Sequence, residues 1–300
     1  MDTVSSAGPA PAKSPAAAFP WVPVAWFAVL LCIPYLGILT GMVREWFQLD
    51  DMGHGIFVPV LSGYIVWANR ETIFDSENPP RPNWWGLLLV VWAFFQAVLG
   101  ILGADYFIAR TAFLLALIGL IVTVGGLETV RKLAFPLFLL LFMIRIPQFV
   151  YSQITFPLQI LASQLATATL SVLGVPVMRE GNVLELANQT LSVVEACSGI
   201  RSLISLSFMA LVYGYFVESK VWVRVVLLAA SIPIAILCNA ARITITGLLS
   251  QYLHQFAEGV YHSFEGWVMF MVALVILIVF HQVLNRLYAR FHARKTRLSS

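Results

Sequence analysis

Long apolar runs alternate with short polar segments along most of the chain. A helix that crosses a membrane needs about 20 mostly apolar residues, with a working range of about 17–25. Runs that reach or approach this length predict membrane helices over residues 21–43, 54–69, 84–103, 106–125, 133–150, 199–217, 221–249 and 262–285. The pattern therefore predicts an all-α polytopic membrane protein with about eight transmembrane helices.

Two consecutive segments depart from this pattern. Residues 152–174 are long enough to span a membrane, but serine, threonine and glutamine recur along them. We expect an interfacial amphipathic helix that lies flat on the outer surface, with a span as the alternative. In residues 175–195, apolar positions alternate between turn-forming groups, which predicts two or three short strands. Because lipid does not tolerate an exposed sheet, this β-element should lie in an extracytoplasmic region that covers residues 152–198.

The composition changes this picture only by excluding an ordinary soluble domain. Hydrophobic residues make up 60% of the chain and charged residues 11%, against about 25% charged residues in soluble domains. Residues 1–20 are rich in Ala, Pro and Ser and contain no signal-peptide core, so we expect a disordered cytoplasmic tail. We expect a single transmembrane catalytic domain over residues 21–285, followed by a basic cytoplasmic tail over residues 286–300.

The positions of lysine and arginine predict the orientation, because cytoplasmic loops carry an excess of these residues. With both termini cytoplasmic and residues 152–174 lying flat, twelve of the eighteen fall on the cytoplasmic side. The outer side keeps Arg44, Arg110, Arg145, Arg179, Arg201 and Arg242. This layout places the segments around Cys197, Arg242 and His262 together near the outer surface.

Cys197 is the candidate nucleophile. The three cysteines have the spacing of neither a zinc site nor a disulfide framework, so we expect no metal and no cofactor, and we interpret Cys32 and Cys238 as packing residues. Cys197 stands at the predicted start of a helix, where the helix dipole and Arg201, one turn later, would lower the pKa of the thiol. Ser198 and the following glycine would let the backbone approach another group. A buried structural thiol is the alternative.

Arg242 and His262 could complete a site for acyl transfer. Arg242 lies inside a long apolar run, where an arginine is costly and usually has a partner or a function. Its guanidinium would stabilise an oxyanion, and the imidazole of His262 would act as general acid and base. The alternatives are that Arg242 only reaches the interface and that His262 is an interfacial polar residue.

Five further residues are candidates for supporting roles. Asn239, one turn before Arg242, would position the guanidinium or a substrate carbonyl. Glu195, Ser198 and Glu265 are candidates for orienting the catalytic groups. His54 would either line the path by which the substrate enters or cap a helix.

These motifs resemble the exosortase/archaeosortase family of prokaryotic membrane-embedded protein-sorting enzymes. The resemblance covers about residues 44–285, and it is specific only through the combination of motifs. The matching segments are 53–59, 179–182, 195–203 (Glu-Ala-Cys-Ser-Gly-Ile-Arg-Ser-Leu), 239–243 (Asn-Ala-Ala-Arg-Ile) and 262–266.

The resemblance implies a sortase-like triad, with Cys197 as nucleophile, Arg242 as oxyanion or substrate stabiliser and His262 as general acid/base. It implies a cysteine transpeptidase or protease of the PEP-CTERM system in the cell inner (plasma) membrane, with its active site facing the extracytoplasmic side. The substrates would be secreted proteins that end in a short motif, a membrane helix and a basic cluster. The acceptor would be a cell-surface group, often in cells that produce exopolysaccharide.

Two other functions are compatible with the same residues. One is a transporter or an exopolysaccharide assembly component without covalent chemistry, in which Arg242 and His262 line a polar pathway and Cys197 is dispensable. Internal repeats would favour a transporter, and we find none. The other is a thiol-dependent acyltransferase that acts on a lipid or glycan. The bilayer is an expected partner in each case, and nucleic acid in none.

Overall fold

The structure is a computed structural model that describes residues 21–73, 81–186, 189–192, 199–252 and 260–298. The chain forms two compact units, one of Met1–Val43 and Phe57–Leu141 and one of Arg44–Ile56 and Phe142–Ser300. The single catalytic domain expected over residues 21–285 stays a prediction.

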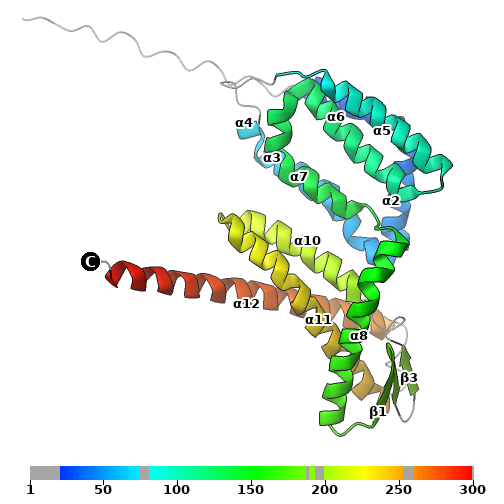
Figure 1. The fold of residues 1–300 in the computed structure, drawn as a ribbon, viewed down its shortest axis with the longest axis vertical. Coiled ribbons are helices and arrows are strands. Elements are labelled where there is room, and N and C mark those ends of the chain that lie inside the picture. Colours follow the sequence, from blue (N-terminus) through cyan, green and yellow to red (C-terminus); the bar gives the residue numbers. More distant parts are fainter. Residues whose placement is uncertain (1–20, 74–80, 187–188, 193–198, 253–259, 299–300) are drawn as a thin grey trace, which may run out of the picture. The chain divides into compact units, whose positions relative to one another are not determined.

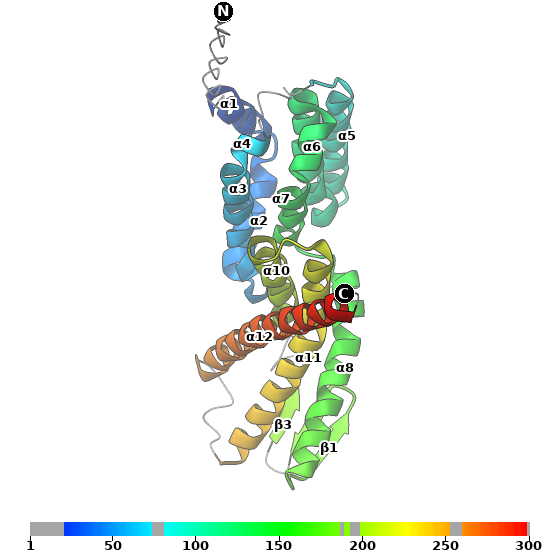
Figure 2. The ribbon, with the colours of Figure 1, turned by 90° about the vertical axis from the view of Figure 1, so that its left-hand side faces the viewer.

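The first unit is helical. Its elements are α1 (Trp21–Cys32), most of α2 (Leu36–Gln48), α3 (Phe57–Ala68), α4 (Arg70–Ile73), α5 (Trp85–Leu102), α6 (Tyr106–Lys132), α7 (Ala134–Leu139) and the start of the 3-10 helix η2 (Leu140–Met143). Helices α5 and α6 lie side by side (Figures 1 and 2). A Cβ atom on Gly86 would collide with the backbone of Gly119, so the two helices approach closely at glycine positions. The carboxylate of Asp105 caps α6 by accepting hydrogen bonds from two backbone N–H groups.

Two predicted helix boundaries in this unit were wrong. The helix predicted over residues 21–43 is two helices, because Pro34 lies in a break between α1 and α2, where its ring and missing N–H disfavour an uninterrupted helix. The helix predicted to end at residue 125 continues to Lys132 through a kink at Gly126. Gly126 has a φ of 76°, which glycine adopts without the steric cost of a side chain.

The second unit combines helices with a small sheet. Its elements are η1 (Asp50–Ile56), α8 (Gln148–Val172), β1 (Val177–Glu180), β2 (Val183–Leu186), β3 (Gln189–Ser192), α10 (Gly199–Val217), α11 (Val221–Tyr252) and α12 (Val260–Leu298). Helix α10 has the predicted boundaries. The predicted end of the last helix at residue 285 was wrong. Helix α12 continues to Leu298, because arginine, alanine, leucine and lysine in this segment are good helix formers.

The described residues confirm a multi-pass α-helical membrane architecture but not eight separate spans. Within the part of the chain that the structure describes, four helical stretches are long and apolar enough to cross a membrane: Trp85–Leu102, Tyr106–Lys132, Val221–Leu249 and Phe264–Arg290. A fifth candidate is the pair Ala134–Met143 and Gln148–Val172, which is bent by 85°. The predicted helix over residues 133–150 is therefore interrupted, and Pro147 stands at the interruption, immediately before α8.

The strands expected before Cys197 form an antiparallel sheet in the order β1-β2-β3. Val177 pairs with Leu186 in the first hairpin. Its two-residue turn is Gly181-Asn182, and Gly181 has a φ of 62°, as tight hairpin turns require. The extracytoplasmic location of the sheet stays a prediction.

Polar residues of α8 face the sheet. Asn182 Nδ2 donates a hydrogen bond to Gln159 Oε1 at 3.2 Å, and Ser163 Oγ lies 3.3 Å from the carbonyl oxygen of Gly181. Gln159 and Ser163 are both buried. Some of the hydrophilic positions that indicated an interfacial helix therefore bind the β-element, and the flat orientation of α8 stays a prediction.

A hydrophobic core joins α8, the sheet and α11. It contains Ala162, Ala166, Leu170, Val175, Leu184, Leu186, Leu191, Ala240 and Ile243. Ala240 and Ile243 flank Arg242 along α11. Because successive residues leave a helix in fixed directions, burial of these two side chains sets the rotation of α11 about its axis and the direction in which Arg242 projects.

A second core packs α10, α11 and α12 together. It contains Leu206, Ala210, Val223, Leu227, Ile234, Ala235, Cys238, Ala273 and Leu277. Cys238 is 7% exposed, which confirms its interpretation as a packing residue. The hydroxyls of Ser207 and Ser231 lie 3.0 Å apart and add a polar contact between α10 and α11.

A buried polar network fastens α12 to the turn between α10 and α11. Glu218 Oε2 lies 3.3 Å from His281 Nε2 and accepts a hydrogen bond from Asn285 Nδ2 at 3.1 Å. The other ring nitrogen of His281 lies 2.9 Å from Tyr213 Oη. The backbone N–H of Lys220 donates to the carboxylate and, with the side chains of Asn285 and His281, lowers the pKa of Glu218 to about 2. Glu218 is therefore an anion at neutral pH, and charge-assisted hydrogen bonds hold α12 at this end.

Candidate functional site

The structure describes the positions of some predicted catalytic residues but not of others. Cys197, Glu195 and Ser198 lie outside the described residues, and Cys197 precedes the first residue of α10 by two positions. His262 lies in the first turn of α12. The meeting of Cys197, Arg242 and His262 in one pocket stays a prediction.

The three helices associated with these residues share one end. Residues 218–220 connect α10 to α11, so these two packed helices run in opposite directions, and α12 packs on both after residues 253–259 (Figures 1 and 2). The start of α10, the end of α11 and the start of α12 therefore lie at the same end of the helix group. The chain positions of Cys197, Arg242 and His262 all belong to this end.

Arg242 forms an ion pair with Glu265 of α12. Its Nε lies 3.8 Å from Glu265 Oε2, and the two side chains are 13% and 19% exposed. Because both charges are largely removed from water, their attraction is screened less than that of a surface pair. Glu265 follows His262 by three positions in α12, so the ion pair lies one helical turn from the predicted general acid/base.

Thr246 and Gly266 also lie beside the pair of Arg242 and Glu265. The hydroxyl of buried Thr246 lies 2.9 and 3.0 Å from the two carboxylate oxygens of Glu265. A Cβ atom on Gly266 would lie 3.2–3.3 Å from the terminal guanidinium atoms of Arg242, closer than ordinary van der Waals contact. The guanidinium therefore lies directly against the backbone of α12.

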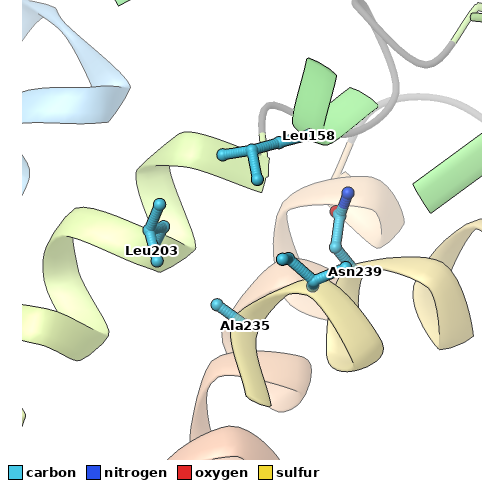
Figure 3. Close-up of a pocket in the computed structure, with 5 residues that line it drawn as sticks. Leu158, Leu203, Ala235 and Asn239 are labelled. Carbon is cyan, nitrogen blue, oxygen red and sulfur yellow. The ribbon is translucent and has the colours of Figure 1, made fainter. Parts of the chain in front are cut away.

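Asn239 lines a small cavity between α8, α10 and α11. The cavity has a volume of about 10 Å³ and is bordered by Leu158, Leu203, Ala235, Ile236 and Asn239 (Figure 3). This is room for about one water-sized group, such as a water or a carbonyl oxygen. Asn239 is 7% exposed and supplies the polar side chain among these five residues. It precedes Arg242 by three positions in α11.

Arg201 belongs to a second charged cluster, at the start of α10. Its charge acts on the phenol of Tyr151, as do the charges of Asp51 and Arg145. Arg145 Nε lies 3.8 Å from Asp51 Oδ2. Helix α10 contacts both η1 and α8, so the start of α10 brings a second arginine into the region of the Arg145–Asp51 ion pair.

His54 docks η1 onto the segment before α8. Its Nε2 lies 3.0 Å from the carbonyl oxygen of Phe142, so this nitrogen carries the proton and donates it. Burial lowers the pKa of His54, which favours the neutral ring. The ring also lies 6.1 Å from that of Phe208 in α10. These contacts hold η1 against the segment before α8. A position of His54 on the substrate path and a capping role both stay predictions.

The glycines on either side of His54 should respond differently to substitution. A Cβ atom on Gly55 would lie 2.5 Å from the indole of Trp46, whereas Gly53 has open space. The indole N–H of Trp46 donates to the carbonyl oxygen of Met143, so its displacement would disturb the same docking. We expect Gly55→Ala to destabilise the protein by about 1–3 kcal/mol, as overpacking does, and Gly53→Ala to change stability by less than about 0.5 kcal/mol. Thermal unfolding in detergent measures both, and equal stabilities would contradict the packing of Trp46 on Gly55.

Sequence reasoning missed part of this site. Thr246 was not a candidate, although it follows Arg242 by four positions and therefore lies on the same helix face. Asp51, Arg145 and Tyr151 were not candidates either, because the charge effects that bring them together with Arg201 depend on the tertiary structure. Among the described residues, no three His, Cys, Asp or Glu side chains gather as metal ligands would.

Comparison with known proteins identifies one family. A family model described as transmembrane exosortase matches residues 46–279, which is more than half of the chain. The match begins at Trp46 and includes η1, both charged clusters and the first part of α12. No curated protein and no solved structure matches the chain.

Proposed function

Because the chain belongs to the transmembrane exosortase family, a family of membrane protein-sorting enzymes, we propose that it is a cysteine transpeptidase or protease. It cleaves the C-terminal sorting signal of secreted proteins and passes them to a cell-surface acceptor or to water. The ion pair of Arg242 with Glu265, one helical turn from His262, is the observation that carries the proposal. A largely buried guanidinium is costly to keep in an apolar segment, and an oxyanion formed nearby would give it a function.

The reaction proceeds in two steps. The Cys197 thiolate attacks the scissile carbonyl carbon, and the resulting oxyanion accepts hydrogen bonds from the Arg242 guanidinium and the Asn239 carboxamide. The carbon–nitrogen bond then breaks, the departing amine takes a proton from protonated His262, and a thioester remains on Cys197. In the second step the neutral imidazole removes a proton from an acceptor amine or a water, which attacks the thioester and releases the thiolate.

The side of the membrane on which the site lies is inferred from the distribution of lysine and arginine, which are in excess in cytoplasmic loops. We place both termini in the cytoplasm and the end of α11 at the extracytoplasmic surface of the inner membrane. The substrate's membrane helix would then dock among the spans, and its motif would reach the catalytic groups at the outer boundary. The substrate signal is a PEP-CTERM-like motif followed by an apolar helix and a basic cluster.

Trapping the thioester tests the function. The enzyme with Cys32→Ala and Cys238→Ala, which leaves Cys197 as its one thiol, is incubated with a secreted reporter that ends in a Pro-Glu-Pro motif, an apolar helix and an arginine cluster. Intact mass spectrometry should show an enzyme whose mass is increased by the acyl fragment, and neutral hydroxylamine should remove the addition. Processing of the reporter by enzyme that never carries an adduct, with the same rate after Cys197→Ala, would overturn the proposal. A membrane assembly component without covalent chemistry would give neither adduct nor processing, which would also overturn it.

A further inference from the structure

Glu265 and the backbone of α12 lie on two sides of the Arg242 guanidinium. The guanidinium is planar and donates hydrogen bonds from fixed directions, so its function depends on orientation as well as on charge. The Nε side faces the carboxylate at 3.8 Å, while the terminal nitrogens lie against the backbone at Gly266. The side chain is 13% exposed, which leaves it little freedom to turn.

We infer that Glu265 is a positioning residue that acts through Arg242, and that Thr246 and Gly266 complete the site that seats the guanidinium. We call these three residues the arginine seat. The inference rests on the proposed function, because it assigns Arg242 to oxyanion stabilisation, and it adds residues that set the direction of its hydrogen bonds.

Thr246 ties the seat back to α11. Its hydroxyl donates to the Glu265 carboxylate, at 2.9 and 3.0 Å from the two oxygens. The same hydroxyl oxygen lies 3.0 Å from the carbonyl oxygen of Arg242, four residues earlier. Because the hydroxyl has one proton, it donates either to the carboxylate or to this carbonyl oxygen, and donation to the carboxylate links α11 to α12 beside the ion pair. The hydrogen bond from Thr246 and the ion pair with Arg242 together orient the Glu265 carboxylate, whereas a lone ion pair would leave the two long side chains mobile.

Gly266 provides the surface on which the guanidinium rests. A side chain at this position would push the terminal guanidinium nitrogens away from α12 by a few tenths of an ångström or more. Catalytic hydrogen bonds are sensitive to displacements of this size, because the donors must meet the oxyanion at about 2.7–3.1 Å. Gly266 is therefore required for the placement of the donors rather than for the helix itself.

Glu265 also balances charge before the substrate binds. Arg242 and Glu265 together are neutral, so the guanidinium can remain in a mostly buried position without an unpaired charge. An oxyanion that forms next to this pair then meets donors that are already oriented.

A double-mutant cycle tests the inference. The variants are Glu265→Gln, which keeps the shape and loses the charge, Thr246→Val, which keeps the shape and loses the hydroxyl, and Thr246→Ser, which restores the hydroxyl. Each is measured for kcat and KM on the reporter in proteoliposomes. We expect Glu265→Gln to lower kcat about tenfold to hundredfold and to change KM less than about twofold, since orientation matters mainly in the transition state. Thr246→Val should lower kcat about threefold to tenfold, and Thr246→Ser should restore it.

The same cycle separates positioning from a general structural effect. In an Arg242→Gln background, Glu265→Gln should cause no further loss of kcat, because its effect passes through the guanidinium. Glu128→Gln is the matched control, since it removes an exposed carboxylate paired with Arg131 at 3.4 Å and should leave kcat unchanged. Losses that multiply in the double variant, or wild-type kcat in Glu265→Gln, would overturn the inference while Cys197→Ala remains inactive. Full activity of Cys197→Ala would instead overturn the proposed function.

Discussion

Replacement of Cys197 by alanine is expected to abolish reporter processing while the protein still inserts into the membrane. The thiol supplies the attacking electron pair, and no other group at the site can form the thioester. Removal of a catalytic nucleophile in other enzymes costs up to about 10⁶ in kcat, so a loss of at least about 10³-fold is expected here. Cys197→Ser should be impaired nearly as strongly, because a hydroxyl is far less acidic than a thiol. The measurement is the fraction of reporter converted per hour at equal amounts of membrane-inserted enzyme.

The other two cysteines are the controls for this result. Cys238 is buried in the core between α10, α11 and α12, and Cys32 is partly buried in α1. Cys32→Ala and Cys238→Ala should retain processing within about twofold, and Cys238→Ala should lower the thermal stability slightly, because it removes one buried atom. If Cys197→Ala processed the reporter at the wild-type rate, or if the loss followed Cys238 instead, the thiol mechanism would have to be abandoned.

Replacement of Arg242 by lysine should be the second most damaging change. Lysine keeps the positive charge, but it offers a single ammonium in place of a planar fork and cannot occupy the seat in the same way. Loss of one oxyanion-hole donor typically costs about 10²–10³ in kcat, and we expect a loss of that size with little change in KM. Arg242→Gln should also lower thermal stability, because Glu265 would be left as an unpaired and largely buried carboxylate.

Arg224 is the matched control on the same helix. Its Nε donates to the carbonyl oxygen of Glu218 at 2.8 Å, and its guanidinium lies 5.3 Å from the ring centre of Tyr215, at the opposite end of α11 from Arg242. Arg224→Lys should leave kcat within about twofold. Equal losses in the two lysine variants would show that Arg242 is only a structural residue, and the oxyanion assignment would fail.

Much of the fold could be predicted from periodicity, because length and hydropathy determine which segments enter a membrane. Helices α5 and α10 and the three strands lie within about one residue of, or inside, their expected ranges. Predictions failed where a proline or glycine acts on the backbone without interrupting the apolar run. Pro34 divides one expected helix, Pro147 precedes the sharp bend before α8, and Gly126 kinks a helix that was expected to end.

The sequence by itself determined the class of protein, its membrane character and the motifs around Cys197, Arg242 and His262, because these depend on composition, on spacing along the chain and on family resemblance. Only the tertiary structure decided the partners of those motifs. Glu265 and Gly266 lie beside Arg242 because burial of apolar side chains in two cores sets how α11 and α12 rotate and cross. Asp51 pairs with Arg145, far from it along the chain, through the same dependence on tertiary packing. That rotation is a property of all the packed side chains together, so no single segment of sequence contains it.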